Sequence, residues 1–202
     1  MRGKFITFEG VDGAGKSTHV EWFANELRSG GHAVLVTREP GGSPLAEKLR
    51  DLVLHEPMDP VTETLLMFAA RDDHLKKRIL PAIAAGTWVV CDRFTDATSA
   101  YQGGGKGVSS GLIDALAGIV HPGFRPDRTL VFDCPFEVSR DRMAKSGRAL
   151  DRFEREGQSF FERVRGAYLA AAAREPQRIQ VVDSVRPLEA IRTDLAAVLR
   201  SL

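Results

Sequence analysis

The stretch GVDGAGKS, residues 10–17, decides the fold because it matches the pattern G-x-x-x-x-G-K-S of a phosphate-binding loop. Its glycines at 10, 13 and 15 allow the backbone to wrap closely around phosphate groups, with N–H groups pointing inward. In such a loop Lys16 neutralises phosphate charge and the Ser17 hydroxyl helps to hold Mg²⁺. An apolar run precedes the loop and an amphipathic stretch follows it, which is the strand–loop–helix context that a nucleotide site requires.

Short apolar runs alternate with longer stretches of helical periodicity along the rest of the chain. The runs predicted as strands are 4–9, 33–37, 87–91, 129–133 and 179–183. The longest helical pattern predicts a third helix over 61–83. This alternation predicts an α/β fold of the P-loop NTPase type, with a parallel sheet of about five strands, helices on both faces and one domain over residues 1–202.

Length, charge and cysteine content limit the class of protein. Lysine plus arginine (28) nearly balances aspartate plus glutamate (27), so no strong field attracts nucleic acid or a membrane. Cys91 and Cys134 are the only cysteines and lie far apart, which argues against a disulfide scaffold or a zinc site. The N-terminus resembles no signal peptide, and no segment reaches membrane-spanning length. We therefore expect a cytoplasmic protein with no nucleic-acid or membrane partner.

The five histidines have no metal-ligand spacing, and we expect them at the surface or at helix ends: His19, His32, His55, His74 and His121. Charged residues collect instead at the carboxyl ends of the predicted strands: Glu9, Arg38, Glu39, Asp92, Arg93, Asp133 and Asp183. Open α/β sheets bind ligands at this edge. The alternative is that strand ends are solvated and carry charges in any case.

The loop alone does not decide between switches, motors and kinases. A GTPase switch usually reads guanine with an N-K-x-D element, but the only asparagine, Asn25, lies inside the first predicted helix. Asp133 is followed by Cys134 and Pro135, not by the D-x-x-G pattern of a switch loop. A mechanical ATPase would bring more chain and a basic track. A switch and a motor are therefore both disfavoured.

Three further stretches carry a family resemblance: TREPGG (37–42), LLMFAAR (65–71) and DRFTDATSAYQGGGKG (92–107). Together with the loop, PDRTLVFD (126–133) and LDRFE (150–154), they resemble bacterial thymidylate kinase over nearly the whole chain. The resemblance implies transfer of the γ-phosphoryl group of ATP to dTMP, giving dTDP and ADP, with Mg²⁺, on a homodimer. The rival enzyme reading is a kinase for another nucleoside monophosphate or a small alcohol. A second rival is a non-catalytic nucleotide sensor.

The resemblance also implies site residues. ATP is expected on Gly10, Val11, Asp12, Gly13, Ala14, Gly15, Lys16, Ser17 and Thr18. dTMP is expected on Asp12, Arg38, Met67, Phe68, Arg71, Arg93, Thr98, Tyr101 and Gln102. The metal ion is expected on Ser17, Glu9 and Asp92.

Within this set, Arg93 matches the arginine that grips the acceptor phosphate, a task suited to a bidentate guanidinium. Its alternative is an arginine paired with Asp92 to close a strand end. Asp12 matches an acidic residue near the sugar and the metal, or else is a simple turn aspartate. Arg71 matches the arginine that recognises the thymine edge, or else is an exposed helix charge. Tyr101 matches an aromatic that lies where a 2′-hydroxyl would intrude.

Two positions depart from the family pattern, and one run has no assigned chemistry. Many members have a phenylalanine four residues before the thymine-reading arginine, whereas this chain has Met67 followed by Phe68. Either side chain could cover the base, because methionine sulfur also packs on rings. Ala97 replaces a serine that is common in the family. The glycine run 103–105 is expected to be a flexible turn.

Some thymidylate kinases that resemble this chain carry an arginine inside the phosphate loop, where this chain has Gly13. The stretch 140–152 has five basic and two acidic residues and is predicted as a mobile lid over ATP. In the subgroup without the loop arginine, basic lid residues supply the missing charge. The alternative is a solvated helix end. We expect Arg148 to contribute most and Arg142 next, with Arg152 able to hold the base of the lid through Glu154. The residues expected to act in catalysis are Lys16, Arg93, Arg142, Arg148, Arg152 and Asp12.

Overall fold

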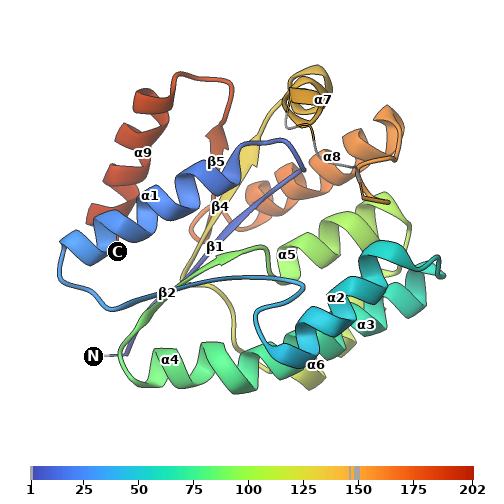
Figure 1. The fold of residues 1–202 in the computed structure, drawn as a ribbon, viewed down its shortest axis with the longest axis horizontal. Helices are drawn as coiled ribbons and strands as arrows, with labels where there is room; N and C mark the ends of the chain where they lie inside the picture. Colours follow the sequence, from blue (N-terminus) through green and yellow to red (C-terminus); the bar gives the residue numbers. More distant parts are fainter. Residues whose placement is uncertain (1, 146, 148–150) are drawn as a thin grey trace.

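The computed structural model describes residues 2–145, 147 and 151–202. This part of the chain forms a five-stranded parallel sheet in the order β2-β3-β1-β4-β5 (Figure 1). The strands are β1 (Phe5–Gly10), β2 (Val34–Arg38), β3 (Trp88–Asp92), β4 (Arg128–Asp133) and β5 (Ile179–Asp183). The predicted parallel α/β sheet is confirmed, and each strand lies within one residue of its predicted bounds.

The central strand of the sheet is more deeply buried than the two edge strands. β1 is the central strand, and all six of its residues are buried, as expected for a strand covered on both faces. β2 and β5 lie at the edges of the sheet and are only partly buried. The phosphate loop leaves the carboxyl end of β1, so the centre of the sheet presents it at the ligand-binding edge.

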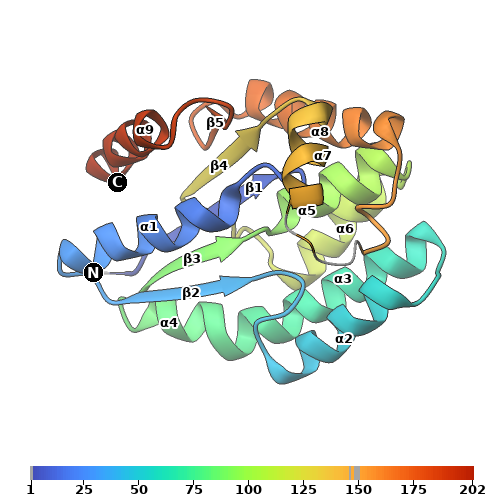
Figure 2. The ribbon, with the colours of Figure 1, turned by 45° about the horizontal axis from the view of Figure 1, so that its top comes forward.

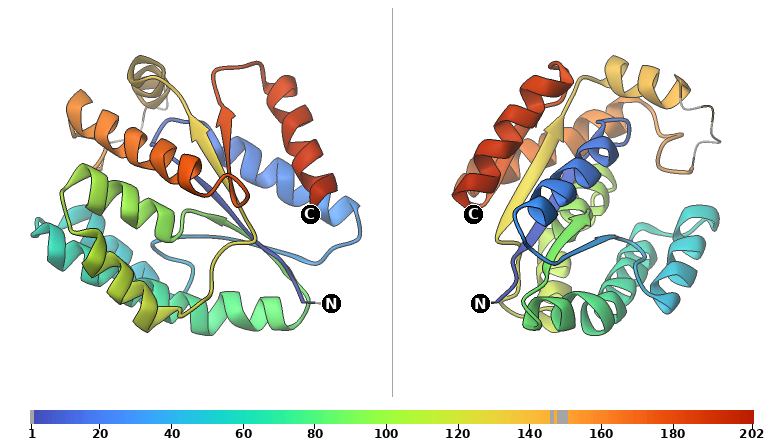
Figure 3. Two further views of the ribbon diagram at one scale, coloured as in Figure 1. Left: turned by 180° about the vertical axis from the view of Figure 1, so that it is seen from behind. Right: turned by 60° about the vertical axis from the view of Figure 1, so that its left-hand side comes forward.

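Helices cover both faces of the sheet. In Figure 3, α1 and α9 lie on one face and α8 lies on the other. The main hydrophobic core surrounds β1 and β4 and includes apolar residues of α1, α8 and α9. The helical segments are α1 (Lys16–Ser29), α2 (Pro44–His55), α3 (Pro60–His74), η1 (Leu75–Ile79), α4 (Leu80–Ala84), α5 (Thr95–Thr98), η2 (Ser99–Gly105), α6 (Ser110–Val120), α7 (Phe136–Lys145), α8 (Gln158–Arg174) and α9 (Leu188–Ser201). No helix in the described ranges is both long and apolar enough to cross a bilayer.

The predicted third helix is present as three consecutive segments, α3, η1 and α4. The middle segment, η1, is a π-helical turn, in which the Leu80 N–H donates to the Leu75 carbonyl. Pro81 follows and has no N–H to continue the ladder. The three segments still follow one another without a break, and α3 lies at the carboxyl edge of the sheet. There α2 and α3 lie opposite α7 (Figure 2).

The glycine run 103–105 is not the flexible turn that we expected, because it ends the π-helical segment η2. A Cβ atom at Gly105 would lie 2.4 Å from Cε2 of Phe160, and one at Gly104 would lie 2.6 Å from Cβ of Ala167. Arg163 of α8 donates to the Gly105 carbonyl at 2.9 and 3.2 Å. The glycines therefore permit η2 to lie directly against α8, which fixes the residues that η2 carries.

Two of the five histidines are buried but lie at helix ends, which the expectation also allowed: His74 is the last residue of α3 and His19 lies in the first turn of α1. His74 is fully buried and contacts Thr37 Oγ1 at 2.7 Å and Glu39 Oε1 at 3.1 Å. His19 is buried and stacks on Phe132 with ring centroids 5.3 Å apart. The absence of metal-ligand spacing did not distinguish a solvated histidine from one that a tertiary contact buries.

We expect Gly105→Ala to lower the free energy of unfolding by about 1–3 kcal/mol, because the added methyl group would overlap the Phe160 ring. Gly166→Ala is the matched control in α8, since a Cβ there meets no described atom within 4 Å. That control should be neutral or stabilising by up to about 1 kcal/mol, because alanine favours helix over glycine. Urea denaturation of both variants measures the difference, and equal stability of the two would contradict the packing argument.

Candidate active site

A cavity of about 470 Å³ opens at the carboxyl edge of the sheet. Its walls come from the phosphate loop, the β2–α2 connection, α2, α3, the end of β3, η2, α7 and the segment after residue 150. Most of the side chains expected at the site line it: Asp12, Lys16, Ser17, Thr18, Arg38, Met67, Asp92, Arg93, Tyr101, Gln102 and Arg142. Residues distant in the sequence therefore meet around one space large enough for a small molecule.

The phosphate loop has the backbone that its glycines predict. Gly13 and Gly15 have φ values of 72° and 86°, which a residue with a Cβ adopts only at a cost. The Lys16 ammonium donates to the carbonyls of Gly10 and Val11, each at 3.0 Å. α1 begins at Lys16, which lines the cavity, so the positive N-terminal end of the helix faces the cavity. No acidic residue in the first turn offsets this charge. This arrangement favours bound anions.

Arg93, Asp12 and Tyr101 form one hydrogen-bonded cluster beside the loop. Arg93 Nη2 donates to Asp12 Oδ1 at 2.7 Å and to the Tyr101 hydroxyl at 2.9 Å. The Tyr101 hydroxyl donates to Asp12 Oδ2 at 2.8 Å. Burial alone would raise the pKa of Asp12, but Arg93 and Lys16 hold it below its ordinary value. Arg93 thus pairs with Asp12 and not with Asp92, and Asp12 is more than a turn residue.

The backbone of Arg93 is in the left-handed region, with φ of 73°. This conformation is unfavourable for a non-glycine residue and persists only where the surroundings impose it. The Arg93 N–H donates to the Phe8 carbonyl at 2.9 Å, and the next N–H, of Phe94, donates to Glu9 Oε1 at 2.7 Å. Two hydrogen bonds to β1 therefore hold the chain in the conformation that turns Arg93 into the cavity.

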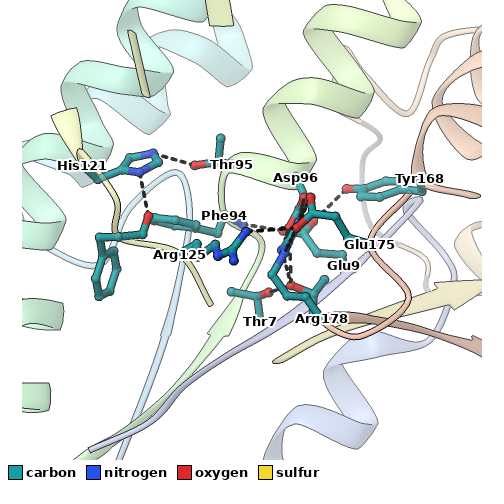
Figure 4. Close-up of polar contacts among 12 residues, drawn as sticks. Thr7, Glu9, Phe94, Thr95, Asp96, His121, Arg125, Tyr168, Glu175 and Arg178 are labelled. Atoms are coloured by element: carbon teal, nitrogen blue, oxygen red, sulfur yellow. Dashed lines mark hydrogen bonds and ion pairs between the residues drawn. The ribbon is translucent and has the colours of Figure 1, made fainter. Parts of the chain in front are cut away.

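Glu9 lies away from the other expected metal ligands. It is fully buried, does not line the cavity and uses its second oxygen to accept from the Tyr168 hydroxyl at 2.9 Å (Figure 4). Burial, reinforced by the nearby charge of Asp96, raises the pKa of Glu9 to about 8. Glu9 therefore supports the backbone next to Arg93 and does not face the cavity.

A second ion-pair network fixes the helix that follows Arg93. Asp96 of α5 receives two hydrogen bonds from Arg178, at 2.6 and 2.9 Å. Arg178 also bonds Glu175 and Thr129, which ties α5 to the start of β5 and to β4 (Figure 4). The chain on either side of Arg93 and Phe94 is therefore anchored to the sheet.

Arg71 is not an exposed helix charge, because it is 1% exposed. Its Nε donates to Glu39 Oε2 at 2.7 Å and its Nη2 donates to Thr98 Oγ1 at 3.1 Å. The guanidinium lies over the rings of Phe68 and Phe94, at 4.8 and 5.0 Å from their centroids. Nη1 is buried and has no partner in the part of the chain that the structure describes. One donor of this fixed guanidinium is thus left unpaired in that part of the chain, although neither Arg71 nor Thr98 is among the residues that line the cavity.

The adjacent side chains of Met67 and Phe68 point in different directions. Met67 lines the cavity, whereas Phe68 packs under Arg71 and against Val108 and Ile113. Consecutive helix residues point about 100° apart, so only one of the two can face the ligand. Met67, and not Phe68, is therefore the side chain that faces the cavity.

The cavity wall includes charged residues to which the sequence analysis gave no role. Glu39, in the quoted TREPGG stretch, holds both Arg71 and His74. Arg50 lines the cavity and donates to the Pro40 carbonyl at 2.9 Å, while exposed Arg38 pairs with Glu47 at 3.0 Å. The charge of Glu39 at a strand end was visible in the sequence. Its partners lie 32 and 35 residues away along the chain, so the sequence did not show which residues they are.

Helix α7 packs directly on the phosphate loop. The Ser139 hydroxyl donates to the Asp12 carbonyl at 2.6 Å, and a Cβ atom at Gly13 would lie 2.5 Å from the Ser139 carbonyl oxygen. Arg142 Nη1 contacts the carbonyls of Ala14 and Gly13 at 3.3 and 3.4 Å, and its Nη2 donates to the Ser184 carbonyl at 2.7 Å. The loop has no room for an arginine at position 13, and Arg142 brings a guanidinium to the same loop.

The expected contact between Arg152 and Glu154 is not formed, because Arg152 bonds other residues. Its Nε donates to the Val53 carbonyl at 2.6 Å, and its Nη2 pairs with Glu63. Glu154 instead accepts from the Asp151 N–H at 3.0 Å. Arg152 is not among the residues that line the cavity. The expectation for Arg148 lies outside the described residues, as does part of the predicted lid.

The fold and site define a P-loop nucleotide-binding protein. The family model for thymidylate kinase matches residues 8–195. Thymidylate kinase of Bordetella pertussis is 57% identical over 201 residues, covering 100% of this chain and 96% of that protein. Thymidylate kinase of Methylobacillus flagellatus is 53% identical, covering 99% of this chain and 98% of that protein. The crystal structure of thymidylate kinase from Ehrlichia chaffeensis superposes with a TM-score of 0.80 at 32% identity, covering 99% of each chain. This chain belongs to the thymidylate kinase family.

We expect Glu9→Gln to weaken the dependence of stability on pH. Between pH 4.5 and about 8 the folded protein keeps the Glu9 proton that the unfolded chain releases, so raising the pH through this window lowers the free energy of unfolding. Glutamine does not titrate and can still accept from the Phe94 N–H. The loss of Tm between about pH 6 and about pH 9 should therefore be smaller in the variant. Equal losses in both proteins would rule out Glu9 as the titrating group.

Proposed function

We propose that this chain transfers the γ-phosphoryl group of ATP to dTMP, giving dTDP and ADP. The observation that carries the proposal is that one cavity joins the phosphate loop to the Arg93–Asp12–Tyr101 cluster. One part of this cavity suits a nucleoside triphosphate, and the other suits an anionic acceptor with a sugar and a base. Family membership supports ATP and dTMP as the two substrates.

The reaction requires positioning and positive charge more than proton removal. The second pKa of a phosphate monoester is about 6, so the acceptor is already ionised near neutral pH and needs no general base. In our proposal Lys16 and the loop N–H groups bind the donor phosphates, and Arg93 grips the acceptor phosphate. Asp12 fixes the guanidinium of Arg93 through the contact at 2.7 Å. Arg38, exposed at the cavity wall, is proposed to face the acceptor.

We propose Mg²⁺ as the metal ion of the reaction, held by Ser17 and Asp92. Both residues line the cavity, and Asp92 Oδ1 is buried without a partner among the described residues. An unpaired carboxylate oxygen beside a hydroxyl fits a hard cation that prefers oxygen ligands. The ranges 2–145, 147 and 151–202 hold no cluster of three His, Cys, Asp or Glu side chains suited to a metal, so phosphate oxygens would complete its shell. Bound Mg²⁺ neutralises charge on the transferring phosphates.

The base is proposed to lie between Met67 and the polar atoms of Arg71 and Gln102. Gln102 lines the cavity, and its Oε1 is buried and has no partner within the described chain. Thymine presents an O4 acceptor beside an N3–H donor, which complements an arginine donor and an amide acceptor. Thr98, which accepts from Arg71, and Tyr101, which fills the space near the sugar, complete the proposed dTMP site.

We also propose a homodimer and a cytoplasmic location. Apolar side chains on neighbouring helices α2 and α3 are exposed and support a helix-to-helix contact between copies: Leu45, Leu52, Val61 and Leu65. The charge balance and the two free cysteines support the location.

A coupled ADP-release assay with dTMP, dUMP, dCMP and AMP tests the proposed reaction. We expect dTMP to give the highest kcat/KM and Lys16→Ala to lower kcat by about 10²–10³-fold with an unchanged circular dichroism spectrum. A kinase for another monophosphate would prefer a different acceptor. A nucleotide sensor would bind ATP and release no ADP with any of them.

Arg142 and Arg152 are the two candidate sources of the additional cation that lie within the described residues. We propose that Arg142 serves the transferring phosphoryl group, because it lies on the loop carbonyls, whereas Arg152 is paired with Glu63. Arg142→Ala should lower kcat by about 10–10³-fold. A single arginine at such a transition state can raise the rate by about 10³-fold or more. Arg152→Ala should affect kcat much less. The proposal is wrong if Arg142→Ala keeps normal turnover, or if Arg152→Ala loses as much. Arg148→Ala belongs in the same series.

A further inference from the structure

We propose that Glu63 is a positioning residue that sets which bases the site accepts. It does so by holding the Gln102 amide with its carbonyl oxygen toward the base. The inference rests on the proposed function, because it takes the base of a nucleoside monophosphate to lie against Gln102. It concerns the difference between cytosine and the two bases thymine and uracil, and it assigns that difference to a residue that touches no substrate.

Glu63 lies on α3 and is fully buried. Its Oε1 accepts from Gln102 Nε2 at 2.7 Å. Its Oε2 pairs with Lys106 at 2.8 Å and also with Arg152. One oxygen thus faces two cations, and a carboxylate has only acceptors. The atom of Gln102 that faces Glu63 must therefore be a donor.

This requirement fixes the direction of the Gln102 amide. Rotating the amide by half a turn would bring its carbonyl oxygen against the carboxylate, which would exchange a charge-assisted hydrogen bond for a repulsion. The carbonyl oxygen consequently faces away from Glu63. It is the atom of Gln102 that is buried and lacks a partner among residues 2–145, 147 and 151–202. Glu63 thus converts an amide that could donate or accept into a fixed acceptor.

Arg71 supplies the matching fixed donor. Its Nε and Nη2 are held by Glu39 and Thr98, which leaves Nη1 without a partner in the described structure. A base with a carbonyl oxygen next to an N–H satisfies both groups, and thymine and uracil have this edge. Cytosine has the reverse order, with an amino donor next to a ring-nitrogen acceptor. Cytosine would leave both buried groups unpaired, and sites of this kind reject such ligands strongly.

A neutral side chain at position 63 would remove the constraint. Glutamine has nearly the shape of glutamate but can both donate and accept, so the Gln102 amide could turn and offer its NH₂ group to the base. One of the two mismatches with cytosine would then disappear, while the contact with the N–H of thymine would weaken. The expected effect is a loss of discrimination and not only a loss of activity.

The test compares Glu63→Gln with Lys106→Met in the full-length protein. Lys106→Met breaks one ion pair of the same carboxylate but leaves Glu63 Oε1 bonded to Gln102. We expect Glu63→Gln to lower the ratio of kcat/KM for dTMP over dCMP by about tenfold or more, since one buried hydrogen bond of this kind is at stake. The KM for ATP should not change. The dTMP/dUMP ratio should also stay constant, because the two bases share the edge that Gln102 reads.

The double variant Glu63→Gln/Lys106→Met provides a second route if the single change leaves Lys106 unpaired and the protein unstable. It should show the same loss of dTMP/dCMP discrimination, whereas Lys106→Met alone should keep the wild-type ratio. A variant that loses dTMP and dCMP turnover in equal proportion would make Glu63 a merely structural residue and overturn the inference. Wild-type protein without preference for dTMP over dCMP would overturn the proposed function and this inference together.

Discussion

The left-handed backbone at Arg93 is the constraint on which the cavity depends. β1 supplies both acceptors that hold it, the Phe8 carbonyl and the Glu9 side-chain oxygen Oε1, and β1 also leads into the phosphate loop. The guanidinium then reaches back to Asp12 in that loop and to Tyr101 in η2. One strand therefore sets the distance between the loop and the arginine, and the ends of β1, β3 and η2 cannot move independently.

Three buried glutamates share one task around the cavity. Glu9 holds the chain at Arg93, Glu39 holds the Arg71 guanidinium, and Glu63 holds the Gln102 amide. Burying a polar group is unfavourable unless it is hydrogen-bonded, so each glutamate requires its partner as much as it positions it. The side chains that we propose to face a ligand are thereby fixed before the ligand arrives, which reduces the entropy that binding would otherwise remove.

Local patterns predicted the sheet, the phosphate loop and the family, because each depends on periodicity or on spacing within a short stretch. The contacts of Glu9 and Arg152 were not predictable in this way. A charge at a strand end can face a ligand or the core, and only the tertiary position of Tyr168 and Phe94 decides this for Glu9. Arg152 pairs with a residue 89 positions away. The choice between Met67 and Phe68 likewise required the direction of α3.

The contact between Gly13 and Ser139 links two positions that a family might otherwise vary separately. A side chain at residue 13 would meet the Ser139 carbonyl oxygen, so a loop arginine and a helix α7 packed as it is here exclude each other. Exchange of one source of positive charge for the other therefore needs coordinated changes in the loop and in α7. A lineage that altered them one at a time would pass through an intermediate with a displaced α7, and thus with Arg142 withdrawn from the loop. Among homologues, the residue at position 13 and the composition of α7 should change together.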